Sequence, residues 1–252
     1  MSVVDGSFDH PLKLEEHASS PLAGGIMQHG YQCGMIWGAT LAAGAQAYRL
    51  YGPGPQAEAK AIIAAQRVVK SFRTRNNSMN CVEITGIDTS SSTTQMIVYF
   101  LLKGGTIRCV RMTAGYAPVA FSEIDSALSE EHVEAPSPPA SCAAVLAQRM
   151  GVSDMHKAMA AGLAGGIGLS GGACGALGAA IWIIGMKTLK EGGKIAFKIP
   201  KAVDTIDRFL KCTGSKFECS EIVGRRFENI ADHAGFLRDG GCSEIIGALT
   251  AM

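Results

Sequence analysis

Residues 162–179 read Gly-Leu-Ala-Gly-Gly-Ile-Gly-Leu-Ser-Gly-Gly-Ala-Cys-Gly-Ala-Leu-Gly-Ala, a glycine-rich segment that passes into an apolar run at Cys174. Glycine lets the chain turn sharply because it adopts positive φ without a Cβ clash, and the apolar run that follows predicts a buried helix. Part of the segment occurs twice, since Leu-Ala-Gly-Gly-Ile stands at 22–26 and again at 163–167. The chain therefore contains an internal repeat.

The cysteines follow the same repeat. The Cys-Gly pair at 33–34 recurs at 174–175, with the offset of 141 residues that also separates the two Leu-Ala-Gly-Gly-Ile segments. The hexad Cys-Val-Glu-Ile-Thr-Gly at 81–86 recurs as Cys-Ser-Glu-Ile-Val-Gly at 219–224 and as Cys-Ser-Glu-Ile-Ile-Gly at 242–247. The cysteine positions that repeat are Cys33, Cys81 and Cys109 in the first copy, and Cys174, Cys219 and Cys242 in the second.

The two copies are separated by the segment Glu-Ala-Pro-Ser-Pro-Pro-Ala at 134–140. Its three prolines disfavour helix and predict an extended linker. We therefore predict two homologous halves, a degenerate first copy at 1–133 and a complete second copy at 141–252. A repeat this long indicates a duplicated domain rather than a solenoid, and we expect the halves to pack with pseudo-twofold symmetry.

Composition narrows the class of protein. The 252 residues carry 23 Lys and Arg against 22 Asp and Glu, a balance that excludes an electrostatically driven nucleic-acid binder or a polybasic membrane anchor. Hydrophobic residues are 47% and charged residues 18%, so the chain can bury a sizeable core. Abundant glycine with only 6% aromatic residues favours closely packed helices over a strand-rich sandwich, and we predict an all-α fold.

Apolar spacing predicts the main helices. Residues 58–72 show an amphipathic helical pattern, and 200–211 is its counterpart, with Pro200 at the first helical position. Ser141 is expected to cap a short helix that carries Cys142. Residues 96–110 read as either a hairpin or a helix, and we predict a helix because the matching stretch before the second Gly-Gly pair is clearly helical.

The uncharged stretch between Lys157 and Lys187 is long enough to cross a bilayer. However, it holds nine glycines, clustered at 165–172, so we expect buried helices broken by a turn and not a membrane span. Residues 1–20 contain four acidic groups and no apolar run, so no signal peptide is expected. Eight cysteines are too few for a disulfide scaffold of this length, which favours free thiols in a reducing cytoplasm.

The thiols are the candidate functional groups. Cys174 follows the glycine-rich turn at the predicted start of a helix, where free N–H groups and the helix dipole should lower its pKa and favour the thiolate. Cys219 and Cys242 each begin a hexad, and Cys142 would be a fourth thiol at a helix start. Four thiolates can hold an iron–sulfur cluster or a zinc ion, whereas the plain alternative is that they are small buried hydrophobes.

Other motifs carry less weight. The chain has no C-x-x-C, which counts against thioredoxin-like exchange and compact metal sites. Gly166-x-Gly168-x-x-Gly171 matches a dinucleotide fingerprint by letter, but no strand is expected before it. Cys212 has no counterpart in the first half and is expected to be structural or a substitute ligand.

The pattern Ser-Cys-Ala at 141–143, the segment 162–179, and the later Cys219 and Cys242 resemble the C-GCAxxG-C-C family of redox-active proteins. The resemblance implies a small helical domain whose four cysteines, here Cys142, Cys174, Cys219 and Cys242, serve redox chemistry or hold an iron–sulfur cluster. Ala179 stands where the motif ends in Gly. In the first copy Met35 replaces the Ala of the motif, and the place of Cys142 falls at Met1, so this copy has three of the four thiols.

We therefore expect a redox-active protein that binds an iron–sulfur cluster through Cys142, Cys174, Cys219 and Cys242, for electron transfer or redox sensing. The alternatives are a metal-free thiol/disulfide oxidoreductase with Cys174 as nucleophile, and a structural zinc-binding module, so enzyme activity is left open. A secondary candidate site comprises Cys33, Cys81, Cys109 and His29. The expected partner is a redox protein of unknown identity, with no nucleic acid and no membrane, and a homodimer is compatible with the spacing.

Overall fold

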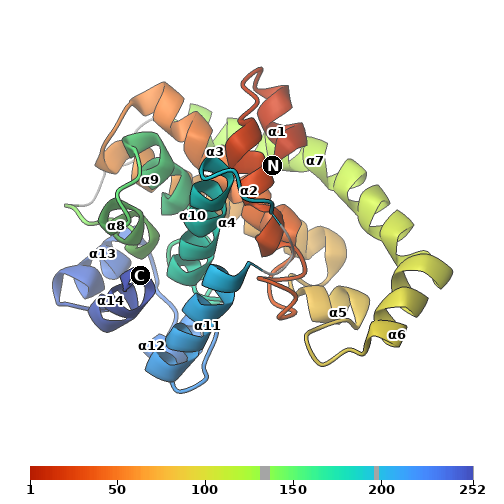
Figure 1. Ribbon diagram of the computed structural model, residues 1–252. Helices are drawn as coiled ribbons and strands as arrows, with labels where there is room; N and C mark the ends of the chain where they lie inside the picture. Colours follow the sequence, from red (N-terminus) through yellow and green to blue (C-terminus); the bar gives the residue numbers. More distant parts are fainter. Residues whose placement is uncertain (131–136, 196–198, 252) are drawn as a thin grey trace.

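The computed structural model describes residues 1–130, 137–195 and 199–251, and these ranges are mainly helical (Figure 1). The first half contains α1 (Ser2–Ser7), α2 (Lys13–Ala18), η1 (Ser20–Leu22), α3 (Gly34–Tyr51), α4 (Pro55–Asn76), α5 (Cys81–Thr85), α6 (Thr93–Ile97), η2 (Val98–Leu102) and α7 (Gly105–Ser129). The second half contains α8 (Cys142–Arg149), α9 (Asp154–Ala161), α10 (Gly175–Lys190), α11 (Pro200–Thr213), α12 (Cys219–Val223), α13 (Ile230–Arg238) and α14 (Ser243–Thr250). Within the described ranges, pairing of the β type is limited to two isolated bridges, so the predicted all-α class is confirmed.

The local signals in the sequence place several helix ends. Pro200 is the first residue of α11, and the Ser141 side chain accepts a hydrogen bond from the Ala144 N–H at 3.2 Å at the start of α8. The ambiguous stretch 96–110 is helical, as its second-half counterpart predicts, and forms α6, η2 and the start of α7. Of the predicted linker, residues 134–136 lie outside the described residues.

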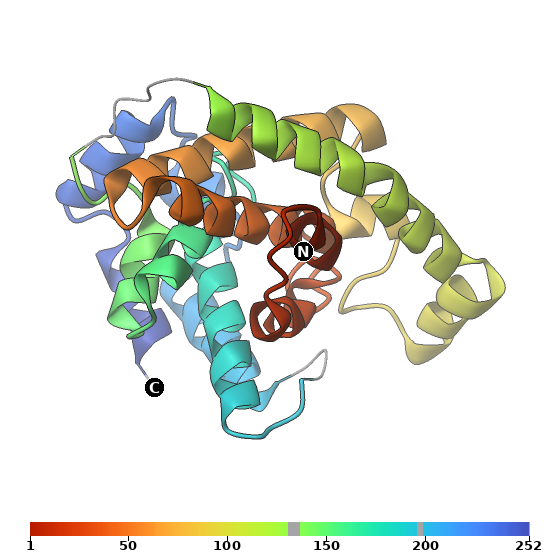
Figure 2. The same cartoon turned by 90° about the horizontal axis from the view of Figure 1, so that it is seen from above.

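The two halves pack on each other reciprocally. Helix α3 of the first half packs against α9 of the second, and α10 of the second half packs against α2 of the first (Figure 2). A two-fold relation between the halves would produce this exchange, because each half then offers the same surfaces to the other. The exchange supports the predicted pseudo-twofold axis, although the axis and the domain boundaries 1–133 and 141–252 stay predictions.

Three contacts between the halves join residues that hold equivalent places in the two copies. The amide oxygen of Gln32 accepts a hydrogen bond from the Ala173 N–H at 2.9 Å. The Glu15 carboxylate lies 2.9 Å from the Nε2 of His156. The Trp37 ring packs so closely on Gly178 that a Cβ there would lie 2.2 Å from it. Near a two-fold axis each residue lies opposite its own counterpart, as these pairs do.

One hydrophobic core serves both halves. It includes the fully buried rings of Trp37 on α3 and Trp182 on α10, and it continues into the second half through α8, α11 and α14. The Trp182 indole N–H donates to the carbonyl oxygen of Glu15 at 3.1 Å, which satisfies the buried polar group of that ring. The segment 158–186 forms α9, the glycine-rich turn and α10, as predicted. Among the described helices, each is too short or too polar to cross a membrane.

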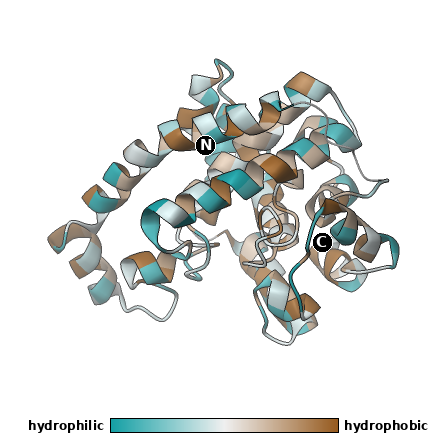
Figure 3. Ribbon diagram, turned by 180° about the vertical axis from the view of Figure 1, so that it is seen from behind, coloured by the Kyte–Doolittle hydropathy of each residue, from teal (hydrophilic) through white to brown (hydrophobic). Residues whose placement is uncertain are grey.

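Helix α6 and η2 form an arm that extends away from the core on the first-half side (Figure 3). The arm is apolar as well as exposed, since Leu101 is 74% and Leu102 77% accessible. In the second half the matching helix α13 folds back toward α8 and carries a buried histidine. The two copies therefore differ in the segment that precedes their last cysteine.

Candidate thiol centre

The glycine-rich turn places Cys174. Gly166 has φ of +79°, and a Cβ on it would lie 2.4 Å from the carbonyl oxygen of Gly172, so the turn folds back on its own backbone. A Cβ on Gly175 would lie 1.6 Å from the carbonyl oxygen of Leu163, so the first turn of α10 rests directly on this segment. Glycine is required at both places because a larger residue would separate the helix from the turn.

A short antiparallel pairing brings the second thiol beside the first. The Cys174 N–H donates to the Phe217 carbonyl at 2.9 Å, and the Cys219 N–H donates to the Gly172 carbonyl at 2.7 Å. The first half repeats this arrangement, since the Cys33 N–H donates to Met79 at 2.8 Å and the Cys81 N–H to Tyr31 at 2.7 Å. The repeat in the sequence is thus also a repeat in backbone structure.

The four predicted thiols of the second half come together from four helix starts. Cys142 and Cys219 are the first residues of α8 and α12, and Cys174 and Cys242 immediately precede α10 and α14. Charge on Cys142 acts on Cys174, on Cys219 and on Cys242, so all four lie within electrostatic reach of one another. Cys142, Cys174 and Cys219 are buried, whereas Cys242 is half-buried.

The pKa of Cys174 is shifted in the direction opposite to our prediction. The N–H groups of Ala176 and Leu177 at the start of α10 do favour its thiolate, but burial and the neighbouring Cys142 outweigh them and raise the pKa to about 12. Burial and the neighbouring thiols likewise raise the pKa of Cys219 and of Cys242. Desolvation of a thiolate costs more than one helix start can offset. Cys174 is therefore a poor nucleophile at neutral pH.

Cys142 differs because it is hydrogen-bonded to His233, a residue that the sequence pattern did not predict to be part of the site. Burial acts against the Cys142 thiolate, but the hydrogen bond and charge of His233, together with the N–H groups of Gly165 and Ala143, bring its pKa below the ordinary value. The same contact raises the pKa of His233 despite the burial of the ring. The spacing of the cysteines could not predict the Cys142–His233 pairing. The sequence feature that could have suggested it is the histidine within the predicted helix at 227–237.

The protonation of His233 follows from its second contact. Its Nδ1 lies 3.0 Å from the carbonyl oxygen of Ala140, which can only accept a hydrogen bond, so Nδ1 carries the proton. Nε2 is then the atom that can take a proton from the Cys142 thiol. A thiol, a histidine and a group that orients the histidine form the arrangement that activates a cysteine nucleophile.

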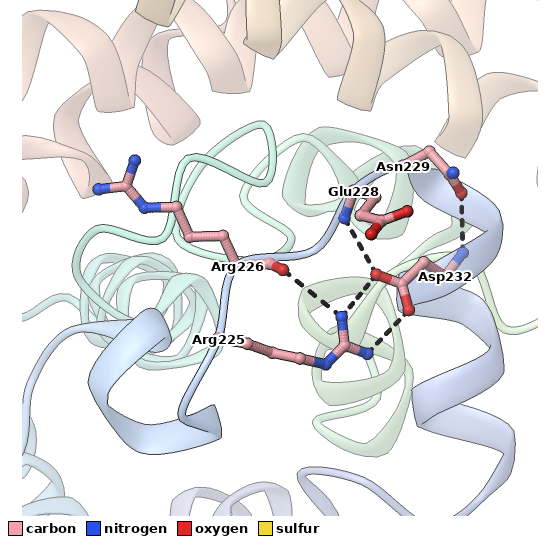
Figure 4. Close-up of polar contacts among 5 residues, drawn as sticks. All are labelled: Arg225, Arg226, Glu228, Asn229 and Asp232. Carbon is pink, nitrogen blue, oxygen red and sulfur yellow. Dashed lines mark hydrogen bonds and ion pairs between the residues drawn. The ribbon is translucent and has the colours of Figure 1, made fainter.

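An ion pair at the surface holds the loop that leads into α13 (Figure 4). The Arg225 guanidinium donates to both carboxylate oxygens of Asp232, at 2.7 and 2.8 Å. The Asn229 side chain accepts from the Asp232 N–H at 2.9 Å and caps the helix. Arg225 lowers the pKa of Asp232 to about 2. Since Asp232 precedes His233, this loop fixes where the imidazole enters the core, and the Asp232 charge favours the imidazolium.

The first half brings Cys33, Cys81 and Cys109 together in a similar way. Burial, with the neighbouring Cys81 and Cys109, raises the pKa of Cys33 to about 12. Cys109 lies inside α7, whereas its counterpart Cys242 precedes a helix. His29, predicted to complement this site, stacks its ring on Phe217 of the second half at 5.2 Å.

Cys212 stands apart from the buried thiols, because it is exposed near the end of α11. All eight cysteines are free thiols in the structure. Among the described residues, the His, Cys, Asp and Glu side chains form no group of three or more that could hold a metal ion. As the side chains lie, the four thiols are therefore not a ready ligand set for a single ion, although their number matches that of an iron–sulfur cluster.

Comparison with known proteins agrees with the duplicated thiol pattern. A family model with the description "Putative redox-active protein (C_GCAxxG_C_C)" matches residues 4–121 and 139–252. No curated protein and no solved structure was found to match the chain. The two matched segments cover most of the sequence and each contains one set of converging thiols. The chain therefore belongs to the C_GCAxxG_C_C family of redox-active proteins and carries its domain as two tandem copies.

Proposed function

We propose that the second half works as a dithiol redox centre in which Cys142 is the reactive thiol and His233 its base. The observation that carries the proposal is the Cys142–His233 hydrogen bond, with the imidazole oriented by the carbonyl oxygen of Ala140. The thiolate is the reactive form of cysteine, and a histidine at this position holds its proton. This assignment replaces Cys174 as the nucleophile.

Cys242 is the partner that we assign to Cys142. Burial raises the pKa of Cys242 most, and Cys142 is the thiol that raises it next, so the two thiols lie within electrostatic reach of each other. Cys242 is also half-buried, whereas Cys174 and Cys219 are buried. The two thiols lose two protons and two electrons when the disulfide forms, and a soluble disulfide of the form RSSR takes both, leaving as two RSH molecules.

Disulfide mapping tests this proposal. We expect the reduced protein, treated with the thiol oxidant diamide at neutral pH, to form a disulfide between Cys142 and Cys242 that non-reducing peptide mass spectrometry identifies. His233→Asn keeps a donor for the Ala140 carbonyl but loses Nε2, so the disulfide should form about tenfold more slowly.

The matched control is His17→Asn, which removes an exposed histidine of α2 and should leave the rate unchanged. A wild-type protein in which Cys142 stays a free thiol, or pairs at random with other cysteines, would overturn the proposal.

An iron–sulfur cluster held by Cys142, Cys174, Cys219 and Cys242 is the second candidate. It is favoured because the Cys142 charge raises the pKa of Cys174, Cys219 and Cys242, and a bound cluster would relieve the repulsion among the thiolates. The cluster and the dithiol centre can be distinguished on protein purified without oxygen, by iron and sulfide analysis and a visible spectrum. Stoichiometric iron and sulfide would favour the cluster, and a colourless protein free of metal would favour the dithiol.

The proposed location follows from the dithiol chemistry, whereas the partner and the assembly do not. We place the protein in the cytoplasm, where reducing conditions return a disulfide of this kind to thiols. Its redox partner and its assembly as a homodimer stay predictions from the sequence. Zinc binding has no support in the positions of the described side chains.

A further inference from the structure

Cys142 is 4% exposed, so a soluble disulfide or thiol cannot reach it directly. This raises the question of how electrons enter or leave the dithiol centre. A surface hollow of about 510 Å³ lies over the Cys242 side of the centre, between the end of α11 and the start of α14. Two cysteines line this hollow, the exposed Cys212 and the half-buried Cys242.

We propose that Cys212 is the exchange thiol of the centre, which carries the disulfide between Cys242 and a small soluble thiol or disulfide in this hollow. The proposal rests on the proposed dithiol function. Helices α11 and α14 pack on each other, which keeps the two cysteine-bearing helix ends together. Lys216 and Glu244 line the same hollow, so charges of both signs border the two cysteines.

The exchange needs no reactant other than the small thiol RSH. Starting from the Cys142–Cys242 disulfide, the Cys212 thiolate attacks the Cys242 sulfur, the Cys212–Cys242 bond forms, and Cys142 leaves as a thiolate paired with His233. A small thiol RSH, as its thiolate, then attacks Cys212 and releases Cys242. A second RSH releases Cys212, so that two RSH become RSSR and the protein gains two thiols. A thiol of low pKa is the better leaving group, which suits Cys142 to the first step.

There is a physical reason why the reactive thiol, Cys142, and the accessible thiol, Cys212, are different residues. A buried thiolate paired with a histidine is protected from water and oxidants but inaccessible, whereas an exposed cysteine is accessible but has no such activation. Cys242 is half-buried, so it can form a disulfide with the buried Cys142 and, on the side of the hollow, with the exposed Cys212. Cys212 has no counterpart in the first half, where the same offset leads to Thr74, so the exchange thiol is a property of the second copy.

The first test measures reduction of the oxidised protein by 2-mercaptoethanol. After alkylation of free thiols, peptide mass spectrometry should show that Cys212→Ser slows loss of the Cys142–Cys242 disulfide by about tenfold or more. Thr213→Ser, which alters the same hollow but no thiol, should react as fast as wild type. An equal rate for Cys212→Ser and wild type would overturn the exchange role while leaving the dithiol function intact.

The second test does not depend on Cys142. In the Cys142→Ser protein, diamide should form a Cys212–Cys242 disulfide, because these two thiols face the same hollow. Failure to form it would show that the two sulfurs cannot meet, and would overturn the proposal. If this disulfide forms but the wild type makes no Cys142–Cys242 disulfide, the dithiol function fails, and the role of Cys212 as its exchange thiol fails with it.

Discussion

Two cysteines at helix starts show why the local sequence is not enough to assign reactivity. Cys142 and Cys174 both stand at the beginning of a buried helix, and both accept hydrogen bonds from backbone N–H groups. Burial raises the pKa of both thiols and prevails at Cys174, where the neighbouring Cys142 adds to it, whereas the hydrogen bond and charge of His233 bring the pKa of Cys142 below its ordinary value. The two thiols therefore differ through His233, which comes from a distant part of the chain.

A buried carboxyl group makes stability depend on pH. Asp5 on α1 is fully buried, neither of its carboxylate oxygens has a hydrogen-bond partner, and burial raises its pKa to about 7. Unfolded Asp5 loses its proton near pH 4 whereas the folded protein retains it, so stability should fall as the pH rises from about 4 to 7. Asp5→Asn removes the charge, and we expect it to raise the free energy of unfolding at alkaline pH by about 2 kcal/mol.

Urea unfolding of wild type and Asp5→Asn at several pH values measures this effect. The two curves should approach each other at acid pH, where wild-type Asp5 is protonated in both states, and separate above neutrality. A constant difference at all pH values would contradict the burial of an ionisable Asp5.

At the scale of elements, the glycine-rich turn should tolerate no side chain at Gly166. Gly166→Ala introduces a Cβ within 2.4 Å of the Gly172 carbonyl at a φ of +79°, and we expect a loss of about 2–4 kcal/mol in the free energy of unfolding. Gly247→Ala is the matched control, because its Cβ would meet no atom within 4 Å and it lies within α14. The control should gain about 0.5–1 kcal/mol. Thermal unfolding of both variants gives the comparison, and a neutral Gly166→Ala would show that the turn is not closely packed.

The Arg225–Asp232 pair belongs to the same scale because it positions the helix that carries His233. Asp232→Asn removes a negative charge next to the imidazole, so we expect the pKa of His233 to fall and that of Cys142 to rise. NMR titration of the His233 ring measures the first shift. The Arg225–Asp232 pair also stabilises the fold at pH values above the ordinary pKa of Asp, and this stabilisation is lost as the pH falls toward 2. The Asp232→Asn protein should lack this pH dependence. An unchanged His233 titration would show that the loop does not influence the thiol centre.

Helix positions were the most predictable part of the structure, because each rests on residues close together in the chain. Ser141 caps α8 and Pro200 opens α11, as their residue types predict. The repeat also predicted correctly that residues 96–110 are helical, where residue propensity alone was ambiguous. What the repeat could not predict is the different course of the two copies after the second cysteine, where one forms an exposed arm and the other brings His233 to Cys142.

At the scale of the whole molecule, Gln32 ties the first half to the glycine-rich turn of the second. Its amide donates to the Gly166 carbonyl at 3.2 Å and accepts from the Ala173 N–H at 2.9 Å, in a fully buried position. Gln32→Leu leaves the Ala173 N–H without this acceptor, and we expect a loss of about 2 kcal/mol in unfolding free energy. Gln46→Leu is the control, since the buried Oε1 of Gln46 has no partner and its removal should cost little. Similar losses for both variants in urea unfolding would contradict a specific bridge between the halves.

The arrangement of the two copies explains why the candidate site was only partly predictable. Cys174, Cys219 and Cys242 could be identified because their positions repeat, whereas Cys142, whose place in the first copy falls at Met1, was identified by the resemblance to the family. The structure places the four thiols within electrostatic reach of one another. His233 and the hollow that contains Cys212 lie outside the repeat, so comparing the chain with itself could not find them. The duplication therefore identifies the cysteines that the two copies share. His233, which acts on Cys142, and the hollow that contains Cys212 are features of the second copy.

The proposed centre depends most on the thiolate of Cys142, and an ultraviolet titration of thiolate absorbance measures this thiolate without any reagent entering the core. The difference between wild type and Cys142→Ser should show one thiolate forming below about pH 8.5, the ordinary value for cysteine. In His233→Asn the same difference should move to higher pH by about one unit or more. A Cys142 that titrates above the ordinary value, or that is unaffected by loss of His233, would contradict the proposed centre.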